Sequence, residues 1–118
     1  MLAEAKAAAD RFAAEENVEL SWERIWSIEP ILFDRELVDM CDAAIEDVAG
    51  ASHRLPSGPL HDAAEVARAG IPTVMMFVQS LRGLSHTKLG DTKPEHIELA
   101  VEAFDHLTTE AIAWVARS

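Results

Sequence analysis

The sequence predicts an α/β fold of single-domain size, and three observations support this. Residues 35–49 and 94–115 repeat apolar side chains at positions i, i+3 and i+4, the spacing of helices with one buried face. Residues 73–78 are apolar almost throughout, as expected of a central strand covered on both faces. The 118 residues, 49% of them hydrophobic, provide enough apolar surface for one core.

The N-terminal part is expected to form a helix followed by a strand. Residues 2–16 are rich in Ala, which has the lowest cost of any residue in a helix. Across 18–28 apolar and polar residues alternate, placing the apolar set on one sheet face. Trp22 and Trp26 indicate packing or an interface, and a core position is the expectation for both. Pro30 donates no amide hydrogen to a ladder and therefore predicts a segment boundary.

The middle of the chain is expected to hold a strongly amphipathic helix, a loop and a short helix. Asp34 is a typical N-cap, and Gly50 is a typical residue at the end of the helix that follows. The cluster of Ser, Pro and Gly in 51–60 cannot continue a helix and predicts a shaped loop. Residues 61–69 then read as a short helix closed by Gly70.

The C-terminal part is expected to contain the 73–78 strand, a loop and a long helix. The loop covers 79–91, at the carboxyl end of the strand. Thr92 and Glu95 fit a capping box, in which each side chain accepts a hydrogen bond from an amide near the other residue. The apolar positions after it keep one helix face buried almost to the end of the chain.

Charge and cysteine content exclude several function classes. The chain carries 10 basic and 21 acidic residues, a net charge of −11, which opposes binding to the phosphate backbone of nucleic acids. A single cysteine, Cys41, forms no intrachain disulfide framework. The longest apolar run, 71–78, is far shorter than the roughly 20 residues of a membrane span. These observations favour a cytoplasmic protein without nucleic-acid or membrane partners.

Two loops carry polar residues that no helix or strand periodicity explains, namely 55–62 and 80–88. Ligands in open α/β sheets collect outside the carboxyl ends of strands, and His86 follows the predicted strand by eight residues. A neutral imidazole there could bind zinc, although a lone loop histidine is more often an ordinary surface residue. His61 and Asp62 could present polar groups at the start of the next helix, or Asp62 could simply cap it.

The two loops and the strand between them resemble a known enzyme family. The run LPSGPLHDA at 55–63 resembles the pattern P-S-G-A-(G/L)-H-D-A, and MMFVQS with GLSHTK at 75–88 resembles M-(I/M)-F-V-(P/Q)-S-x-x-G-(I/L)-S-H. Both patterns belong to the hydantoinase/carbamoylase-type dinuclear zinc amidohydrolases, which include N-carbamoyl-L-amino-acid hydrolase, allantoate amidohydrolase and beta-ureidopropionase. The order and separation of the motifs also match.

The resemblance implies roles for five residues. His86 corresponds to a zinc ligand, in a site that holds two zinc ions in the complete family enzyme. The loop residues Ser57, Gly58, His61 and Asp62 correspond to the lining of the substrate pocket. The substrate implied is a small molecule with a carbamoyl or ureido group.

The resemblance also implies that the chain corresponds to the C-terminal portion of a family member. Residues 1–29 would be the last helix and strand of the lid or dimerisation domain. Residues 30–118 would be the C-terminal part of a catalytic domain built as a zinc-exopeptidase-like α/β/α sandwich.

Two departures and one absence limit the expected activity. Pro59 removes an amide hydrogen from the pocket loop, and Gly90 stands where the family usually has Glu. The resemblance implies that the remaining zinc ligands and the general base come from the N-terminal two-thirds of a family member, to which this sequence has no matching motifs. One His leaves three positions of a tetrahedral zinc unfilled. We therefore expect no catalysis by the chain alone. The alternative is a non-catalytic structural or binding module. Exposed strand edges predict a homo-oligomer or pairing with a missing N-terminal portion.

Overall fold

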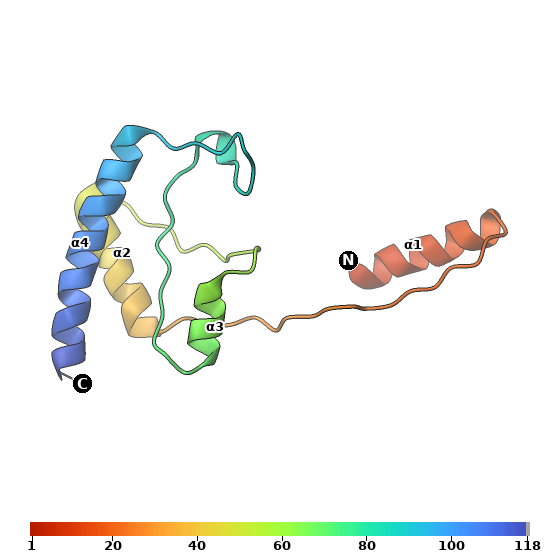
Figure 1. Ribbon diagram of the computed structural model, residues 1–118, viewed down its shortest axis with the longest axis horizontal. Coiled ribbons are helices and arrows are strands. Elements are labelled where there is room, and N and C mark those ends of the chain that lie inside the picture. Colours follow the sequence, from red (N-terminus) through yellow and green to blue (C-terminus); the bar gives the residue numbers. More distant parts are fainter. Residues whose placement is uncertain (118) are drawn as a thin grey trace. The chain divides into compact units, whose positions relative to one another are not determined.

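The computed structural model describes residues 1–117 and divides the chain into two compact units, Met1–Pro30 and a second unit that starts at Ile31. Four α-helices and one 3₁₀ helix make up its regular structure (Figure 1). They are α1 (Leu2–Glu15), α2 (Arg35–Ala49), α3 (Asp62–Arg68), η1 (Leu81–Gly83) and α4 (Pro94–Arg117). Within residues 1–117 there is no strand, so the described chain is mostly helical.

The first unit confirms the expected helix but not the expected strand. Helix α1 covers the Ala-rich stretch, and an ion pair of Lys6 with Asp10 at 2.8 Å joins successive turns. Residues 18–28 form no strand, because within the described chain their one backbone hydrogen bond to another segment runs from the Val18 amide to the Ala13 carbonyl of α1, at 3.0 Å. Trp22 and Trp26 are 43% and 65% exposed, so the expected core role is wrong for both.

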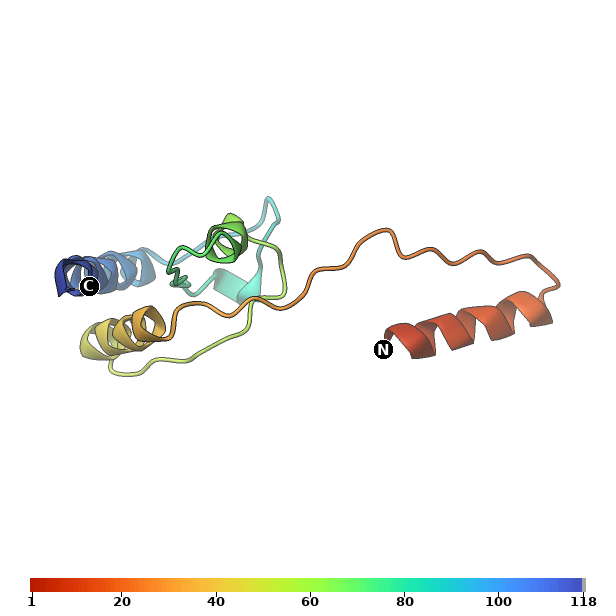
Figure 2. The ribbon, with the colours of Figure 1, turned by 90° about the horizontal axis from the view of Figure 1, so that it is seen from below.

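The second unit is organised by the packing of α2 against α4, which lie side by side in two perpendicular views (Figures 1 and 2). Helix α2 begins as predicted, with the Asp34 carboxylate accepting a hydrogen bond from the Leu37 amide at 3.0 Å. It ends at Gly50, whose φ of 79° is left-handed. The core between the helices consists of Leu37, Cys41, Ala44, Ala103 and Leu107.

Helix α4 starts differently from the expected capping box. In the described chain neither the Thr92 hydroxyl nor the Glu95 carboxylate bonds to an amide of the other residue. The Lys93 carbonyl accepts from the His96 amide at 3.0 Å, which tightens the first turn, and from the Ile97 amide at 3.2 Å, as in a regular helical turn. No helix within residues 1–117 has both the length and the hydropathy that crossing a membrane requires.

Residues 73–78 do not form the expected central strand. Val74 and Met76 pack against the core between α2 and α4, so alternate side chains do face one side as in a strand. Phe77 and Val78 are 48% and 42% exposed, because no layer covers the other side. The link to a neighbouring segment is one hydrogen bond, from the Asp34 amide to the Thr73 carbonyl at 3.1 Å. The α/β sandwich is absent from residues 1–117, because a sheet needs further strands beside this one.

Candidate functional site

The loop that follows α2 is fastened to that helix by Arg54. Its Nε donates to Asp42 at 2.5 Å and its Nη2 donates to Asp39 at 2.6 Å. The Ser52 hydroxyl donates to the same Asp42 at 3.0 Å. Burial acts to raise the pKa of Asp42, but the hydrogen bonds from Arg54 and Ser52 together with the Arg54 charge outweigh it, so that the pKa lies below its usual value. These contacts, called the Arg54 clamp below, hold residues 52–54 on α2, directly before the predicted pocket loop 55–62.

The predicted pocket loop contains a hydrogen-bonded serine and histidine. Ser57 Oγ lies 2.7 Å from His61 Nε2, and the Ser57 hydroxyl also lies 3.2 Å from the Pro59 carbonyl oxygen. A hydroxyl has one hydrogen to donate, so donation to Pro59 makes Nε2 of His61 the donor to Ser57. Gly58 is exposed, and no other part of the chain approaches the position where a Cβ would stand. The loop therefore presents two linked polar side chains at the surface.

His61 also connects the loop to the second motif. Its ring lies against Phe77, with 6.0 Å between centroids and an angle of 57° between the planes. Two motifs that are separate in sequence thus meet through an imidazole and a phenyl ring. Asp62 is exposed and is the first residue of α3, whose N-cap position is occupied by His61 without a side-chain cap. The expectation that Asp62 caps this helix is therefore wrong.

His86 lies in a second loop, 80–91, whose two ends are joined. The Leu81 amide donates to the Asp91 carbonyl at 2.7 Å, and Arg82 Nη2 reaches the Leu89 carbonyl at 3.3 Å. The Gly90 amide donates to the Thr87 carbonyl at 3.0 Å and forms a tight turn directly after His86. A Cβ at position 90 would lie 3.1 Å from that carbonyl oxygen. This close approach gives a physical reason for Gly at position 90.

The backbone of His86 is held in a left-handed conformation, with a φ of 53°. Non-glycine residues adopt this conformation uncommonly, at a cost of roughly 1–2 kcal/mol. The side chain is exposed, so its position is not explained by packing. Within residues 1–117 no hydrogen bond or ring contact joins His86 to Ser57 or His61.

The residues present do not make a zinc site by themselves. Within residues 1–117 there is no group of three or more His, Cys, Asp or Glu side chains that could hold a metal ion. An exposed imidazole on a constrained loop is suited to be one ligand. The other ligands of any metal at His86 would have to come from outside this part of the chain.

Comparison with known proteins identifies the family. The model of peptidase family M20/M25/M40 matches residues 4–110, which is most of the chain. The chain belongs to this family. Within it, the carbamoylase-type resemblance drawn from the two motifs is confirmed by the relatives.

Two curated relatives have similar names. The chain is 30% identical over 98 residues to an N-carbamoyl-L-amino acid amidohydrolase of Geobacillus stearothermophilus, covering 83% of this chain and 24% of that protein. It is 29% identical over 110 residues to an N-carbamoyl-L-amino-acid amidohydrolase of Rhizobium meliloti, covering 93% of this chain and 26% of that protein. The chain thus spans about a quarter of the length of these relatives. No solved structure matches it.

The sequence pattern missed two contacts that shape this region. Arg54 meets Asp39 and Asp42 from 15 and 12 residues away, and Phe77 meets His61 from across the α3 segment. Periodicity carries no signal for such contacts, because they depend on how the loop folds back. For the contact of Arg54 with Asp39 and Asp42, the sequence offers one signal, the excess of carboxylates on α2.

Proposed function

We propose that the loops 55–62 and 80–91 form the C-terminal part of the active site of a zinc-dependent amidohydrolase. Its substrates would be N-carbamoyl amino acids or related compounds with a non-peptide C–N bond. The observation that carries this proposal is that the two motifs occur in a chain of the M20/M25/M40 family whose relatives are named N-carbamoyl-L-amino acid amidohydrolases.

Each predicted site residue has a role that its surroundings support. The Ser57 hydroxyl and the His61 ring are polar and hydrogen-bonded to each other, and Gly58 beside them carries no side chain, which suits hydrogen bonding to a small ureido or carboxylate group. Asp62 would contribute an exposed carboxylate next to His61. His86 would be one metal ligand, held by a constrained loop.

The chain alone would lack catalysis, because the described residues supply no set of metal ligands. The remaining ligands would be supplied by a polypeptide that corresponds to the other part of the relatives. The same observation favours a second candidate function, a non-catalytic module derived from the family. The two candidates differ in whether a completed site turns over substrate.

The test is to graft this chain in place of the matched quarter of the Geobacillus relative. Zinc-dependent release of ammonia from an N-carbamoyl amino acid is then measured. We expect activity that is lost in His86→Ala and reduced in His61→Ala. His53→Ala is the matched control, because His53 is an exposed loop histidine outside both motifs. A folded, zinc-containing graft without activity would favour the non-catalytic module.

A further inference from the structure

The predicted pocket loop is held by side-chain contacts near its two ends. Residues 53–60 are exposed, and within residues 1–117 no hydrogen bond between backbone groups reaches them. The Arg54 clamp holds the start of the loop on α2. At the other end His61 is half-buried, and its ring lies against Phe77 with 6.0 Å between the centroids. The contact with Phe77 therefore holds the imidazole at the second end of the loop.

The position of Phe77 is set by the core and not by the loop. Val74 and Met76, on the same segment, pack against the core between α2 and α4. The Thr73 carbonyl accepts a hydrogen bond from the Asp34 amide at 3.1 Å, which ties the start of the segment to the start of α2. Successive side chains of such a segment point to opposite sides, so Phe77 faces away from the core. Phe77 thus offers the loop a ring whose place does not depend on the loop.

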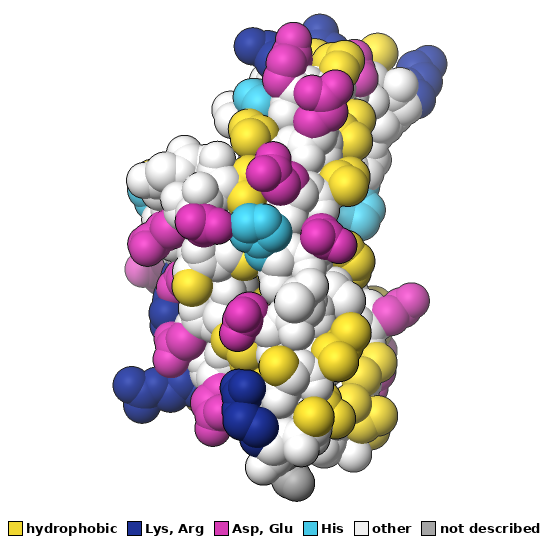
Figure 3. All heavy atoms as spheres, turned by 90° about the vertical axis from the view of Figure 1, so that its left-hand side faces the viewer, with side chains coloured by type: hydrophobic (Ala, Val, Ile, Leu, Met, Phe, Trp, Pro, Cys, Tyr) yellow, Lys and Arg dark blue, Asp and Glu magenta, His cyan; other side chains and the backbone are white. Residues whose placement is uncertain are grey.

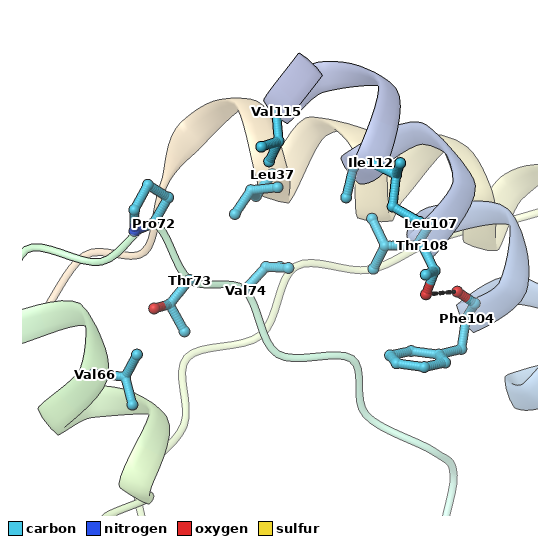
Figure 4. A pocket seen from close by; sticks show the side chains of 11 residues that line it. Leu37, Val66, Pro72, Thr73, Val74, Phe104, Leu107, Thr108, Ile112 and Val115 are labelled. Atoms are coloured by element: carbon cyan, nitrogen blue, oxygen red, sulfur yellow. Dashed lines mark hydrogen bonds between the residues drawn. The ribbon is translucent and has the colours of Figure 1, made fainter. Parts of the chain in front are cut away.

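A short turn after α3 brings His61 back to Phe77. The chain reverses at Gly70, whose φ of 83° is left-handed. Val66 of α3 and the first residues of the segment 72–78 line the same open apolar groove (Figure 4). Helix α3 and this segment therefore run side by side in opposite directions, and the start of α3 lies at the far end of the segment.

Ser57 and Phe77 together orient the His61 ring. Nε2 of His61 lies 2.7 Å from Ser57 Oγ, and since the Ser57 hydroxyl donates to the Pro59 carbonyl, Nε2 carries the hydrogen of this bond. In a neutral imidazole with a hydrogen on Nε2, Nδ1 is an acceptor. Within residues 1–117 this Nδ1 makes no hydrogen bond. The orientation of the ring thus decides where a ligand N–H group meets an acceptor.

We infer that Phe77 is a positioning residue of the proposed site. Its ring holds the His61 imidazole in the orientation in which Nε2 donates to Ser57 and Nδ1 is presented to an N–H group of the ligand, such as that of a carbamoyl group. Without the ring of Phe77, rotation about the side-chain bonds of His61 moves the donor and the acceptor out of place. The inference rests on the proposed function and gives the second motif a role separate from metal binding.

A histidine outside the site provides an internal reference. His106 Nδ1 lies 3.0 Å from Asp47 Oδ2, where α4 meets α2. Figure 3 shows the outer face of these two helices, on which histidine side chains lie among acidic ones. Within residues 1–117 no ring contact or hydrogen bond joins His106 to Phe77. A substitution of Phe77 should therefore leave the His106 ring unaffected.

The first test is NMR relaxation of the histidine ring C–H bonds in the isolated chain. We expect the His61 ring to be ordered, with an order parameter of about 0.85, and to fall below about 0.6 in Phe77→Leu. Phe77→Tyr keeps the ring and should retain the order. Val78→Ala is the matched control, because Val78 is the next residue of the segment and is 42% exposed. Equal thermal midpoints of Phe77→Leu and Val78→Ala would show that both variants keep the fold.

The second test measures ammonia release from an N-carbamoyl amino acid by the graft on the Geobacillus relative. In Phe77→Leu the KM should rise about two- to tenfold, the ratio that corresponds to one aromatic contact, while kcat and zinc content change little. Phe77→Tyr and Val78→Ala should keep the KM of the parent graft. This split between KM and kcat separates positioning of the imidazole from a general loss of structure.

Several results would overturn the inference. They are a disordered His61 ring in the unchanged chain, equal order in Phe77→Leu, an equal loss of order in Val78→Ala or Phe77→Tyr, and an active graft whose KM is the same in Phe77→Leu. A graft without ammonia release contradicts the proposed activity. The order of the His61 ring in the isolated chain then still decides whether Phe77 holds it.

Discussion

The indole Nε1 of Trp114 donates a hydrogen bond to Glu36 Oε2 at 2.6 Å, across 78 positions of sequence. The contact joins the first turn of α2 to the last part of α4 and fixes how the two helices lie against each other. Leu37 of α2 and Val115 of α4 line the same open apolar groove. The hydrogen bond therefore supports the packing of α2 on α4 on which this groove depends.

Replacing Glu36 by Ala should lower the free energy of unfolding by about 1 kcal/mol, because a hydrogen bond to a charged acceptor is lost at a partly exposed position. Denaturant unfolding measures this change. Glu36→Gln keeps a side-chain oxygen that can accept from the indole and should retain most of the stability. Equal losses in the two variants would contradict a stabilising role for the hydrogen bond.

The Arg54 clamp should make stability depend on acidic pH. Asp42 has a lowered pKa in the folded chain, so its carboxylate stabilises the fold above the unfolded value of 3.8, and this contribution disappears as the pH falls through the lower folded pKa. Thermal unfolding between about pH 5 and pH 2 measures the effect. Asp42→Asn should flatten this part of the pH profile.

Arg54→Ala tests the same clamp through the loop. Without Arg54 the loop loses its ties to Asp39 and Asp42, so limited proteolysis should cut residues 51–61 faster. Arg24→Ala serves as the control, because Arg24 lies in the other unit. Unchanged cleavage of the loop would show that the ion pairs do not hold it.

The left-handed backbone of His86 predicts that a non-glycine residue at this position lowers the stability of the chain. Since glycine adopts left-handed φ freely, His86→Gly should be more stable than His86→Ala by about 1 kcal/mol. Chemical denaturation of the two variants measures the difference. If Ala and Gly are equally stable at this position, the left-handed backbone is not a source of strain.

The core between α2 and α4 should be sensitive to truncation. Leu107 is 6% exposed, so Leu107→Ala should lower the free energy of unfolding by about 2–4 kcal/mol, measured by denaturant unfolding, whereas Val101→Ala at a 65% exposed position should lower it little.

Burial, followed by the negative charge of Asp42, raises the pKa of the buried Cys41 thiol. Thiol labelling should therefore be slow in the native chain and faster in Leu107→Ala. Equal labelling rates would show that the two residues do not share one core.

The helices were predictable because their signals are local. The side chain of Asp34, the left-handed Gly50 and the apolar spacing of α2 all lie within one element, and the structure confirms each of them. The two motifs were also visible in sequence, because they are short runs of unusual residues. Their contact through His61 and Phe77 was not, since it depends on the path of α3 between them.

The two expected strands did not form, because a strand requires a neighbouring segment with which its backbone can form hydrogen bonds. The alternation at 73–78 correctly indicated that Val74 and Met76 face a core. It could not show whether a neighbour exists, and within residues 1–117 only Asp34 donates to this segment. The same reasoning explains 18–28, where the apolar pattern is present but no partner segment pairs with it. The division into lid and catalytic parts and the roles of the site residues stay predictions.

The most direct test of the account is the zinc content after dialysis of three proteins: the isolated chain, the graft on the Geobacillus relative, and the graft with His86→Ala. The account predicts less than one tightly bound zinc per isolated chain, retained zinc in the graft, and a clear loss of zinc in the His86→Ala graft. Two tightly bound zinc ions in the isolated chain, or unchanged zinc in the His86→Ala graft, would contradict it.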